Sequence, residues 1–411
     1  MRVLFVLPYV PSRIRVRPYH FVRELGRRHE ITLLALGGEA DSGDVEHLRA
    51  FCERVEVVPF SRDQALASLG RAALRGEPLQ AAVCATDRLA RRLTSLLEET
   101  GPDVVHVEHL RAAHVVDLLP ESTPKLYDSV DCISLLHART LQASHSLRQR
   151  LLAFVELRRT RGYETRLLSR FDQVVVTSPV DARALRDLDP RAAVTVVANG
   201  VDLEHFAPLE GRRDPATLVF SGKMSYHANV TAALHFSERI FPLVKRRWPD
   251  VRLRIVGSNP PSAVRRLAVD PAVEVTGRVE DMREAIGRAT IAVCPVTVKV
   301  GIQNKILEAM ALALPVVSSR EGAEGLEALA GRDFLVADDP AQFAEHVCRL
   351  LDDEELRAVV GQAGRQYVET HHRWSVAADT LERLYQSSID ASAASAAAGP
   401  SRPLRSYGNR D

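Results

Sequence analysis

The sequence has little of several features that mark whole classes of protein. Its 411 residues contain no apolar run near the ~18 residues of a membrane-spanning helix. The early apolar segment Val3–Leu7 ends at Pro8 and is followed by arginines, which predicts a first strand and not a signal peptide. We therefore expect a cytoplasmic protein, at most peripheral to the cytoplasmic membrane.

Cysteine is also scarce, and its pattern excludes further classes. The five cysteines show no C-x-x-C spacing, so neither a zinc site nor a disulfide framework is indicated, and we expect reduced core thiols: Cys52, Cys84, Cys132, Cys294 and Cys348. The net charge of +1 argues against a nucleic-acid partner. No G-x-G-x-x-G and no carboxylate cluster occur, so we expect neither a bound cofactor nor a metal.

Lysine is the scarcest charged residue. Only five of the 54 basic residues are lysine, and three of these fall in two segments of the second half: Lys223, Lys299 and Lys305. A compact ammonium acts as a point charge beside backbone amides, so these three are candidates to neutralise a diphosphate. The alternative is that these three lysines occupy their positions by chance.

Length and patterning predict two α/β domains. A chain of 411 residues exceeds one ordinary core, and short apolar strands alternate with helical segments in both halves. This order is typical of parallel, doubly wound sheets with a ligand crevice at the strand ends. We predict Rossmann-like domains over 1–209 and 210–370, a helix over 371–386 that crosses back to the first domain, and a disordered tail over 387–411.

The segment 299–325 is the strongest candidate for a binding site. A strand beginning at Ile291 precedes a helix that starts around Gln303 and stops before Pro315. A helix start suits a diphosphate, and the helical spacing of Asn304, Lys305 and Glu308 offers cations, amides and a carboxylate on one turn. A phosphate needs the first two, and a ribose diol needs the third. An ordinary exposed Lys/Glu face is the alternative.

Polar residues also follow the other predicted strands. The strand 216–221 ends in Ser221-Gly222-Lys223, where glycine lets the backbone approach a ligand. In the first half, His106, Glu108 and His109 lie at or near the end of strand 103–109, and Asp128 and Asp131 follow Lys125. A structural role is the alternative for a lone histidine.

One long helical segment, 138–170, is rich in arginine. Its arginines alternate with leucines, so this segment could contact anionic lipid or a lipid-diphosphate acceptor. The alternative is a solvated basic face in which Glu156 and Glu164 pair with the arginines.

Two motifs resemble the family 4 (group 1) retaining glycosyltransferases. The run Glu308-Ala-Met-Ala-Leu-Ala-Leu-Pro-Val-Val, followed by Gly322 and Glu324-Gly325, is similar to that family's donor motif, in which a glutamate on this helix binds the nucleotide ribose. The pattern Asn-Gly-Val-Asp over 199–202, with Phe206 and Pro208, resembles its interdomain junction, with a sharp turn at Asn199-Gly200. The family's usual first glutamate is replaced by Val300, so donor identity does not carry over. The variant Gly301-Ile-Gln-Asn-Lys305 resembles an exopolysaccharide-associated subgroup.

The resemblance implies a GT-B fold, with two facing domains and an interdomain cleft. It implies transfer, with retention, from a nucleotide-diphosphate sugar, a UDP-sugar rather than a GDP-sugar, to a glycan, lipid-linked or small-molecule acceptor in polysaccharide or glycoconjugate synthesis. The acceptor would approach the first domain. The predicted catalytic residues are Asp128, His109 and Lys223, and the predicted donor site comprises Gly222, Lys223, Lys299, Gly301, Asn304, Lys305 and Glu308. A nucleotide-sugar epimerase or hydrolase and a non-catalytic nucleotide-sugar-binding protein are the alternatives.

Overall fold

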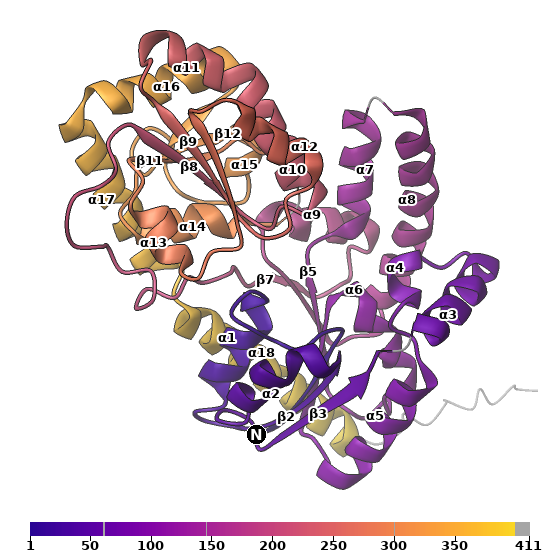
Figure 1. The fold of residues 1–411 in the computed structure, drawn as a ribbon. Helices are drawn as coiled ribbons and strands as arrows, with labels where there is room; N and C mark the ends of the chain where they lie inside the picture. The colour runs from indigo at the N-terminus through magenta and orange to yellow at the C-terminus, as the bar shows by residue number, and fades with distance from the viewer. Residues whose placement is uncertain (61, 145, 300, 399–411) are drawn as a thin grey trace, which may run out of the picture.

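The computed structural model describes residues 1–60, 62–144, 146–299 and 301–398, which form two α/β domains (Figure 1). Val300 and residues 399–411 therefore lie outside the described residues. Each domain has one parallel sheet between layers of helices, as the alternating pattern predicts. The expected pair of doubly wound domains is confirmed.

The first sheet has the strand order β3-β2-β1-β4-β5-β6-β7. Its strands are β1 (Arg2–Leu7), β2 (Glu30–Gly37), β3 (Arg54–Pro59), β4 (Val104–Glu108), β5 (Lys125–Val130), β6 (Gln173–Val176) and β7 (Val194–Val196). Its helices are α1 (Val16–Leu25), α2 (Ser42–Leu48), α3 (Arg62–Arg75), α4 (Leu79–Ala82), α5 (Asp87–Thr100), α6 (His109–Ala112), α7 (Ile133–Ala143), α8 (Leu147–Leu168) and α9 (Pro179–Leu188), with short 3-10 turns at Glu39–Asp41 and Ala113–Leu118.

The second sheet has the order β10-β9-β8-β11-β12-β13. Its strands are β8 (Thr217–Ser221), β9 (Arg252–Val256), β10 (Val273–Gly277), β11 (Ile291–Cys294), β12 (Val316–Ser319) and β13 (Leu335–Ala337). Its helices are α10 (His227–His235), α11 (Phe241–Arg247), α12 (Ser262–Arg265), α13 (Met282–Gly287), α14 (Asn304–Ala311), α15 (Arg320–Ala323), α16 (Pro340–Asp352) and α17 (Glu354–His371), with a π turn at Phe236–Ile240 and a 3-10 turn at Arg266–Val269.

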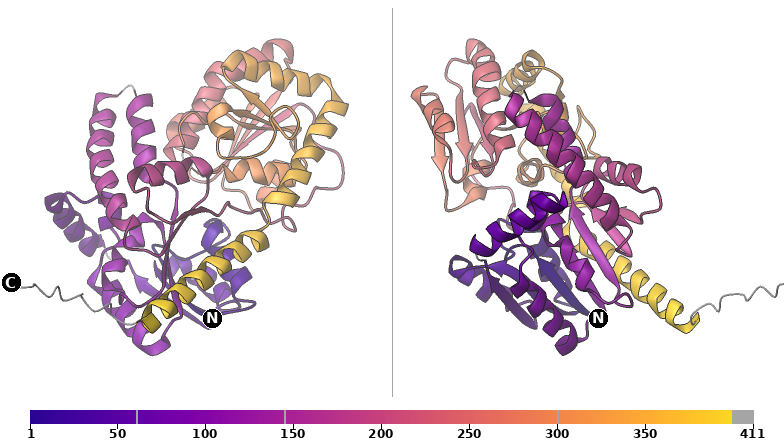
Figure 2. Two further views of the ribbon diagram at one scale, coloured as in Figure 1. Left: turned by 180° about the vertical axis from the view of Figure 1, so that it is seen from behind. Right: turned by 90° about the vertical axis from the view of Figure 1, so that its right-hand side faces the viewer.

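The last helix, α18 (Trp374–Ala398), returns to the first domain and crosses it beside α1 (Figure 2). Trp374, Leu381 and Tyr385 are buried in the same core cluster as β1 and β2. The sequence predicts such a helix over 371–386. Its predicted end at 386 is wrong, because Ser388 is buried and the alanine-rich segment after it continues the helix. Residues 387–398 are therefore not a disordered tail.

Two further expectations are corrected. The segment 138–170 is not one helix: α7 and α8 form a hairpin, and Ser146 caps α8 by accepting a hydrogen bond from the Gln149 amide. The expected sharp turn at Asn199-Gly200 is not found, because these two described residues belong to no turn, bend, helix or strand. Gly200 is needed for close packing instead, since a Cβ there would lie 2.6 Å from the Trp374 amide nitrogen.

All five cysteines are buried and free, as predicted. No helix in the described part of the chain combines the length and the apolarity that crossing a membrane requires.

Candidate active site

The strand order places one switch point in each domain. In the first sheet the order reverses between β1 and β4, and in the second between β8 and β11. Ligands of open α/β sheets bind outside the carboxyl ends of the strands at such points. The loops after these four strands carry most of the residues predicted from the sequence.

The donor-side carboxylate lies on α14, the helix that follows β11. Helix α14 starts at Asn304, as predicted, and the carboxylate of Glu308 is half-buried one turn later. Among the described residues this carboxylate has no hydrogen-bond or ion-pair partner. Burial raises the pKa of Glu308 to about 6, while Lys305 opposes the shift. An unpaired carboxylate of this kind is available to a hydroxyl donor.

Lys305 is held beside this carboxylate by side-chain amides. Its ammonium donates to Asn229 Oδ1 at 2.8 Å and to Gln303 Oε1 at 3.1 Å. Asn229 in turn donates through Nδ2 to the Lys223 carbonyl at 3.0 Å, which ties α14 to the loop after β8. Burial lowers the pKa of Lys305, and within the described chain its ammonium contacts two neutral oxygens and the face of the Phe220 ring. The site therefore keeps a positive charge that no described carboxylate neutralises by direct contact.

The loop after β8 approaches its neighbours closely. Gly222 has a φ of +149°, and a Cβ there would lie 2.7 Å from Asn229 Nδ2. A Cβ at Gly257 would lie 1.7 Å from the Gly222 carbonyl oxygen. Both positions therefore require glycine. Lys223 is exposed, and within the described chain its ammonium has no hydrogen-bond or ion-pair partner.

Lys299 and Gly301 face the first domain instead. Lys299 is 2% exposed, and its ammonium donates to the carbonyls of Gly301 and Glu324, so its donors are used inside the protein. The Gly301 amide donates to Asp181 Oδ2 at 3.0 Å. These contacts use the Lys299 ammonium and the Gly301 amide within the protein, which favours a role in positioning the loop.

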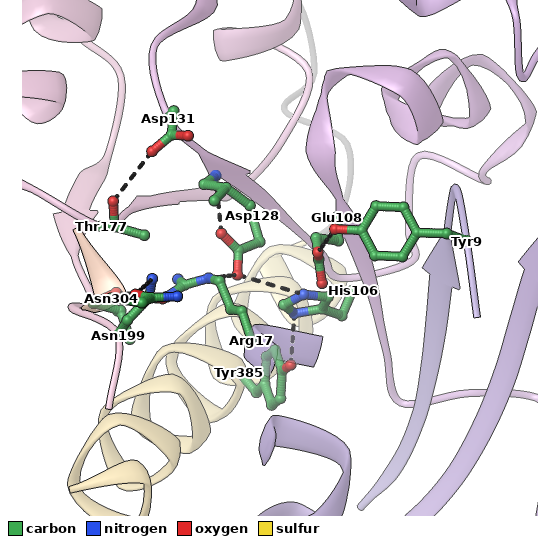
Figure 3. Close-up of polar contacts among 12 residues, drawn as sticks. Tyr9, Arg17, His106, Glu108, Asp128, Asp131, Thr177, Asn199, Asn304 and Tyr385 are labelled. Carbon is green, nitrogen blue, oxygen red and sulfur yellow. Dashed lines mark hydrogen bonds and ion pairs between the residues drawn. The ribbon is translucent and has the colours of Figure 1, made fainter. Parts of the chain in front are cut away.

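The first-domain side is built around an ion pair. Asp128, at the end of β5, is fully buried and accepts from Arg17 Nε at 2.7 Å (Figure 3). Arg17, on α1, also donates through Nη1 to the Val197 carbonyl and to Asn199 Oδ1, each at 2.9 Å. Burial raises the pKa of Asp128, and Arg17 opposes this shift.

Asn199 continues this network into the second domain. Its Nδ2 donates to Asn304 Oδ1 at 3.0 Å (Figure 3). Asn304 is the first residue of α14, so hydrogen bonds connect Asp128 with the start of the helix that carries Glu308. The two domains are thereby connected by hydrogen bonds at this point.

The histidines differ from the prediction in one respect. His106 is fully buried and its Nδ1 lies 2.7 Å from the Tyr385 hydroxyl, which is the structural role given as the alternative. His109 is half-buried, with a φ of +67°, and its Nδ1 accepts from the Arg111 amide at 3.3 Å. Burial and Arg111 lower the pKa of His109 to about 3, so its ring is neutral at pH 7.

Two further carboxyl groups lie at these strand ends. Glu108 accepts from the Tyr9 hydroxyl at 2.6 Å, and burial and then Asp128 raise its pKa to about 8. Asp131 accepts from Thr177 Oγ1 at 3.3 Å, and burial and then Asp181 raise its pKa to about 7. Burial therefore favours the protonated form of both carboxyl groups compared with carboxyl groups in water.

Sequence reasoning missed Arg17, Asn199 and Asp181 as members of the site. The strand order held the signal for Arg17, because this arginine follows the first strand, which borders the switch point. Asp181 gave no such signal, since it lies on α9 and reaches the second domain only in the folded chain. No group of three metal-binding side chains lies together in the part of the chain that the structure describes.

Two family models match the chain, one in each half. Residues 15–205 match the model described as Glycosyltransferase Family 4, and residues 215–353 match Glycosyl transferases group 1. Each half of the chain is therefore similar to a glycosyltransferase domain. Their boundary falls at the junction between β7 and β8, where the resemblance of 199–208 also placed it.

Curated relatives match about half of the chain. A GDP-mannose-dependent monoacylated alpha-(1-6)-phosphatidylinositol monomannoside mannosyltransferase from Corynebacterium glutamicum is 29% identical over 213 residues, 46% of this chain and 55% of the relative. A D-inositol 3-phosphate glycosyltransferase from Corynebacterium efficiens is 28% identical over 50% of this chain and 53% of the relative. The matches span about half the length of these relatives.

Solved glycosyltransferase structures share the fold over nearly the whole chain. A sucrose-phosphate synthase from Thermosynechococcus elongatus has a TM-score of 0.73 at 16% identity, and the match covers 95% of this chain and 100% of that one. HepE of Anabaena, solved in complex with UDP, has a TM-score of 0.64 at 14% identity, with 94% and 100% covered. These matches confirm the GT-B fold.

Proposed function

We propose that this glycosyltransferase moves a sugar from a nucleotide-diphosphate sugar to an acceptor, with retention of anomeric configuration. One observation carries the proposal: the unpartnered, half-buried carboxylate of Glu308 lies one turn beyond Asn304 and Lys305, at the switch point of the second sheet. A ribose diol and a diphosphate together need this combination of groups.

The residues divide by role. Glu308 accepts hydrogen bonds from the ribose hydroxyls, and the start of α14 offers amides to the diphosphate. Lys223 and Lys305 supply the positive charge that stabilises the departing diphosphate, so the step needs no metal. Lys299 and Gly301 hold the loop before α14.

On the first domain, Asp128 is the carboxylate closest in the network to the donor helix. Its ion pair with Arg17, and the hydrogen bond from Arg17 to Asn199, support its assignment to the acceptor side of the junction. We propose that Asp128, with His109 as the second candidate, acts near the reacting sugar. A neutral His109 could accept a proton from an acceptor hydroxyl, but its low pKa makes it a weak base.

The donor and the acceptor are proposed by class. A UDP-sugar remains the preferred donor, with a GDP-sugar as the alternative because one relative is named for GDP-mannose. The acceptors in the relatives' names are phosphatidylinositol mannosides and inositol phosphate, so a lipid-linked or inositol-type acceptor is favoured over a free glycan. Exopolysaccharide synthesis is the narrower proposal, and peripheral contact with the inner membrane surface accompanies a lipid acceptor.

A panel of UDP-, GDP- and ADP-sugars tests this function. Slow donor hydrolysis that an added acceptor stimulates, with the product's anomeric configuration matching the donor's by NMR, supports a retaining transferase. Interconversion of the donor sugars would identify an epimerase instead. Binding without turnover under any acceptor would identify a nucleotide-sugar-binding protein.

A further inference from the structure

The hairpin of α7 and α8 projects from the first domain. The two helices pack against each other and stand beyond the edge of the first sheet in opposite views of the molecule (Figures 1 and 2). Glu164 holds the base of the hairpin by accepting from the amides of Ile133 and Ser134. Every described side chain in the first two turns of α8, residues 147–152, is exposed.

Large apolar side chains gather on this exposed part. Leu147 is 84% exposed, Leu151 67%, Leu152 57% and Phe154 45%. The spacing 147, 151 and 154 places three of them along one side of the helix. Scattered apolar residues on a surface need no explanation, whereas a contiguous group of this kind marks an interaction site.

The charges around these side chains all have one sign. Arg148, Arg150 and Arg161 are exposed and have no acidic partner among the described residues. The two acidic residues of α8 are buried: Glu164 caps α7, and Glu156 accepts from the Leu79 amide and from Arg159. The alternative of a basic face neutralised by its own glutamates therefore holds only for Arg159.

We propose that this basic apolar face, formed by Leu147, Arg148, Arg150, Leu151, Leu152 and Phe154, docks on an anionic lipid bilayer. Exposed arginines meet lipid phosphates while the leucines and Phe154 enter the boundary between headgroups and acyl chains. Two copies of the chain that paired through this face would bring arginines against arginines, which disfavours a dimer. This contact would bring the protein to a lipid-linked acceptor, and in that sense the inference rests on the proposed function. Binding to the bilayer itself does not depend on turnover.

Vesicle co-sedimentation of the full chain tests the proposal. The probes are phosphatidylcholine vesicles with and without phosphatidylglycerol, at two salt concentrations. We expect binding to the anionic vesicles that weakens with salt. Arg148→Gln with Arg150→Gln should weaken it by about fivefold for each arginine, and Leu151→Ser with Phe154→Ser by about tenfold or more.

A matched pair on the second domain serves as the control. Arg266 and Val269 are also exposed, with Val269 at 85%, and they lie on a different surface. Arg266→Gln with Val269→Ser should bind anionic vesicles like the unaltered chain. In the Leu151→Trp variant, the emission of the introduced tryptophan should shift to shorter wavelength when anionic vesicles are added, because its indole ring leaves water.

Three outcomes would overturn the proposal. These are no binding of the unaltered chain to anionic vesicles, binding that survives both variants on α8, and a concentration-dependent dimer in sedimentation velocity that the α8 variants abolish. UDP affinity, measured by calorimetry on the same samples, should be equal in all variants. Failure of nucleotide binding in the unaltered chain would refute the donor site and leave the lipid result to stand by itself.

Discussion

Glu308 offers the most direct test of the donor site. Its carboxylate has no hydrogen-bond or ion-pair partner within the described chain, so a bound ribose would provide its first. Glu308→Gln keeps the size of the side chain and removes its charge. The affinity for a nucleoside should fall by about 1.5–3 kcal/mol, the usual value of a hydrogen bond to a charged group, which is roughly 10- to 150-fold.

The same carboxylate should make nucleoside binding depend on pH. Ribose hydroxyls donate to the ionised form, and burial raises the pKa of Glu308 to about 6 in the free protein. With that value about nine tenths of the protein is ionised at pH 7 and about one tenth at pH 5. Because only the ionised form binds well, the dissociation constant should rise roughly tenfold as the pH falls from 7 to 5.

Calorimetry with uridine and guanosine measures both effects. Nucleosides are preferred to diphosphates, since a terminal phosphate itself titrates at about pH 6. The Glu308→Gln variant is its own control, because it should show weak binding that no longer changes between pH 5 and 7. Nucleoside affinity that is flat with pH in the unaltered chain, or equal in the variant, would remove Glu308 from the ribose site.

Other residues give shorter tests. Asp128→Asn should lower turnover by about 10²-fold with nucleotide affinity unchanged, and normal turnover would contradict its role. Lys223→Ala should weaken binding of UDP more than of uridine, and equal weakening would make this lysine a surface charge. Lys299→Ala should lower the melting temperature, because its ammonium holds two carbonyls, and an unchanged value would contradict this positioning role. Truncation after Gln386 should also lower the melting temperature, whereas truncation after Ala398 is the control. Equal melting temperatures for the two truncated chains would show that residues 387–398 of α18 do not contribute to stability.

The fold was predictable because apolar periodicity and length carry it. Strands such as β1 and β11 are short apolar runs bounded by proline or polar residues, and the sequence predicts them near their observed limits. β13 was missed because its three residues, Leu335–Ala337, are too few to show a pattern. The hairpin break was also missed, although Ser146 before Leu147 is a helix start signal. Near the C-terminus, the composition of residues 387–411 predicted disorder, but the helix propensity of alanine extends α18 to Ala398.

The donor side was more predictable than the acceptor side for a physical reason. Asn304, Lys305 and Glu308 share one turn of helix, so their proximity follows from spacing alone. Arg17 and Asp128 are 111 positions apart, and Asn199 and Asn304 are 105 apart. Contacts at such separations depend on the strand order and the packing of α18, which no local pattern encodes.

The scarcity of lysine has a wider cause than diphosphate binding. Lys125 donates to three carbonyls, each at 3.2 Å, and Lys299 donates to two, so a compact ammonium serves here where several carbonyls converge. Lys245 forms an ion pair with Asp270, and Lys305 is held by two amide oxygens. Among the five, Lys223 alone has no such partner in the described chain. The rarity of lysine therefore does not by itself indicate a phosphate site. Lys223 and Lys305 are candidates to bind a diphosphate because they lie after β8 and at the start of α14.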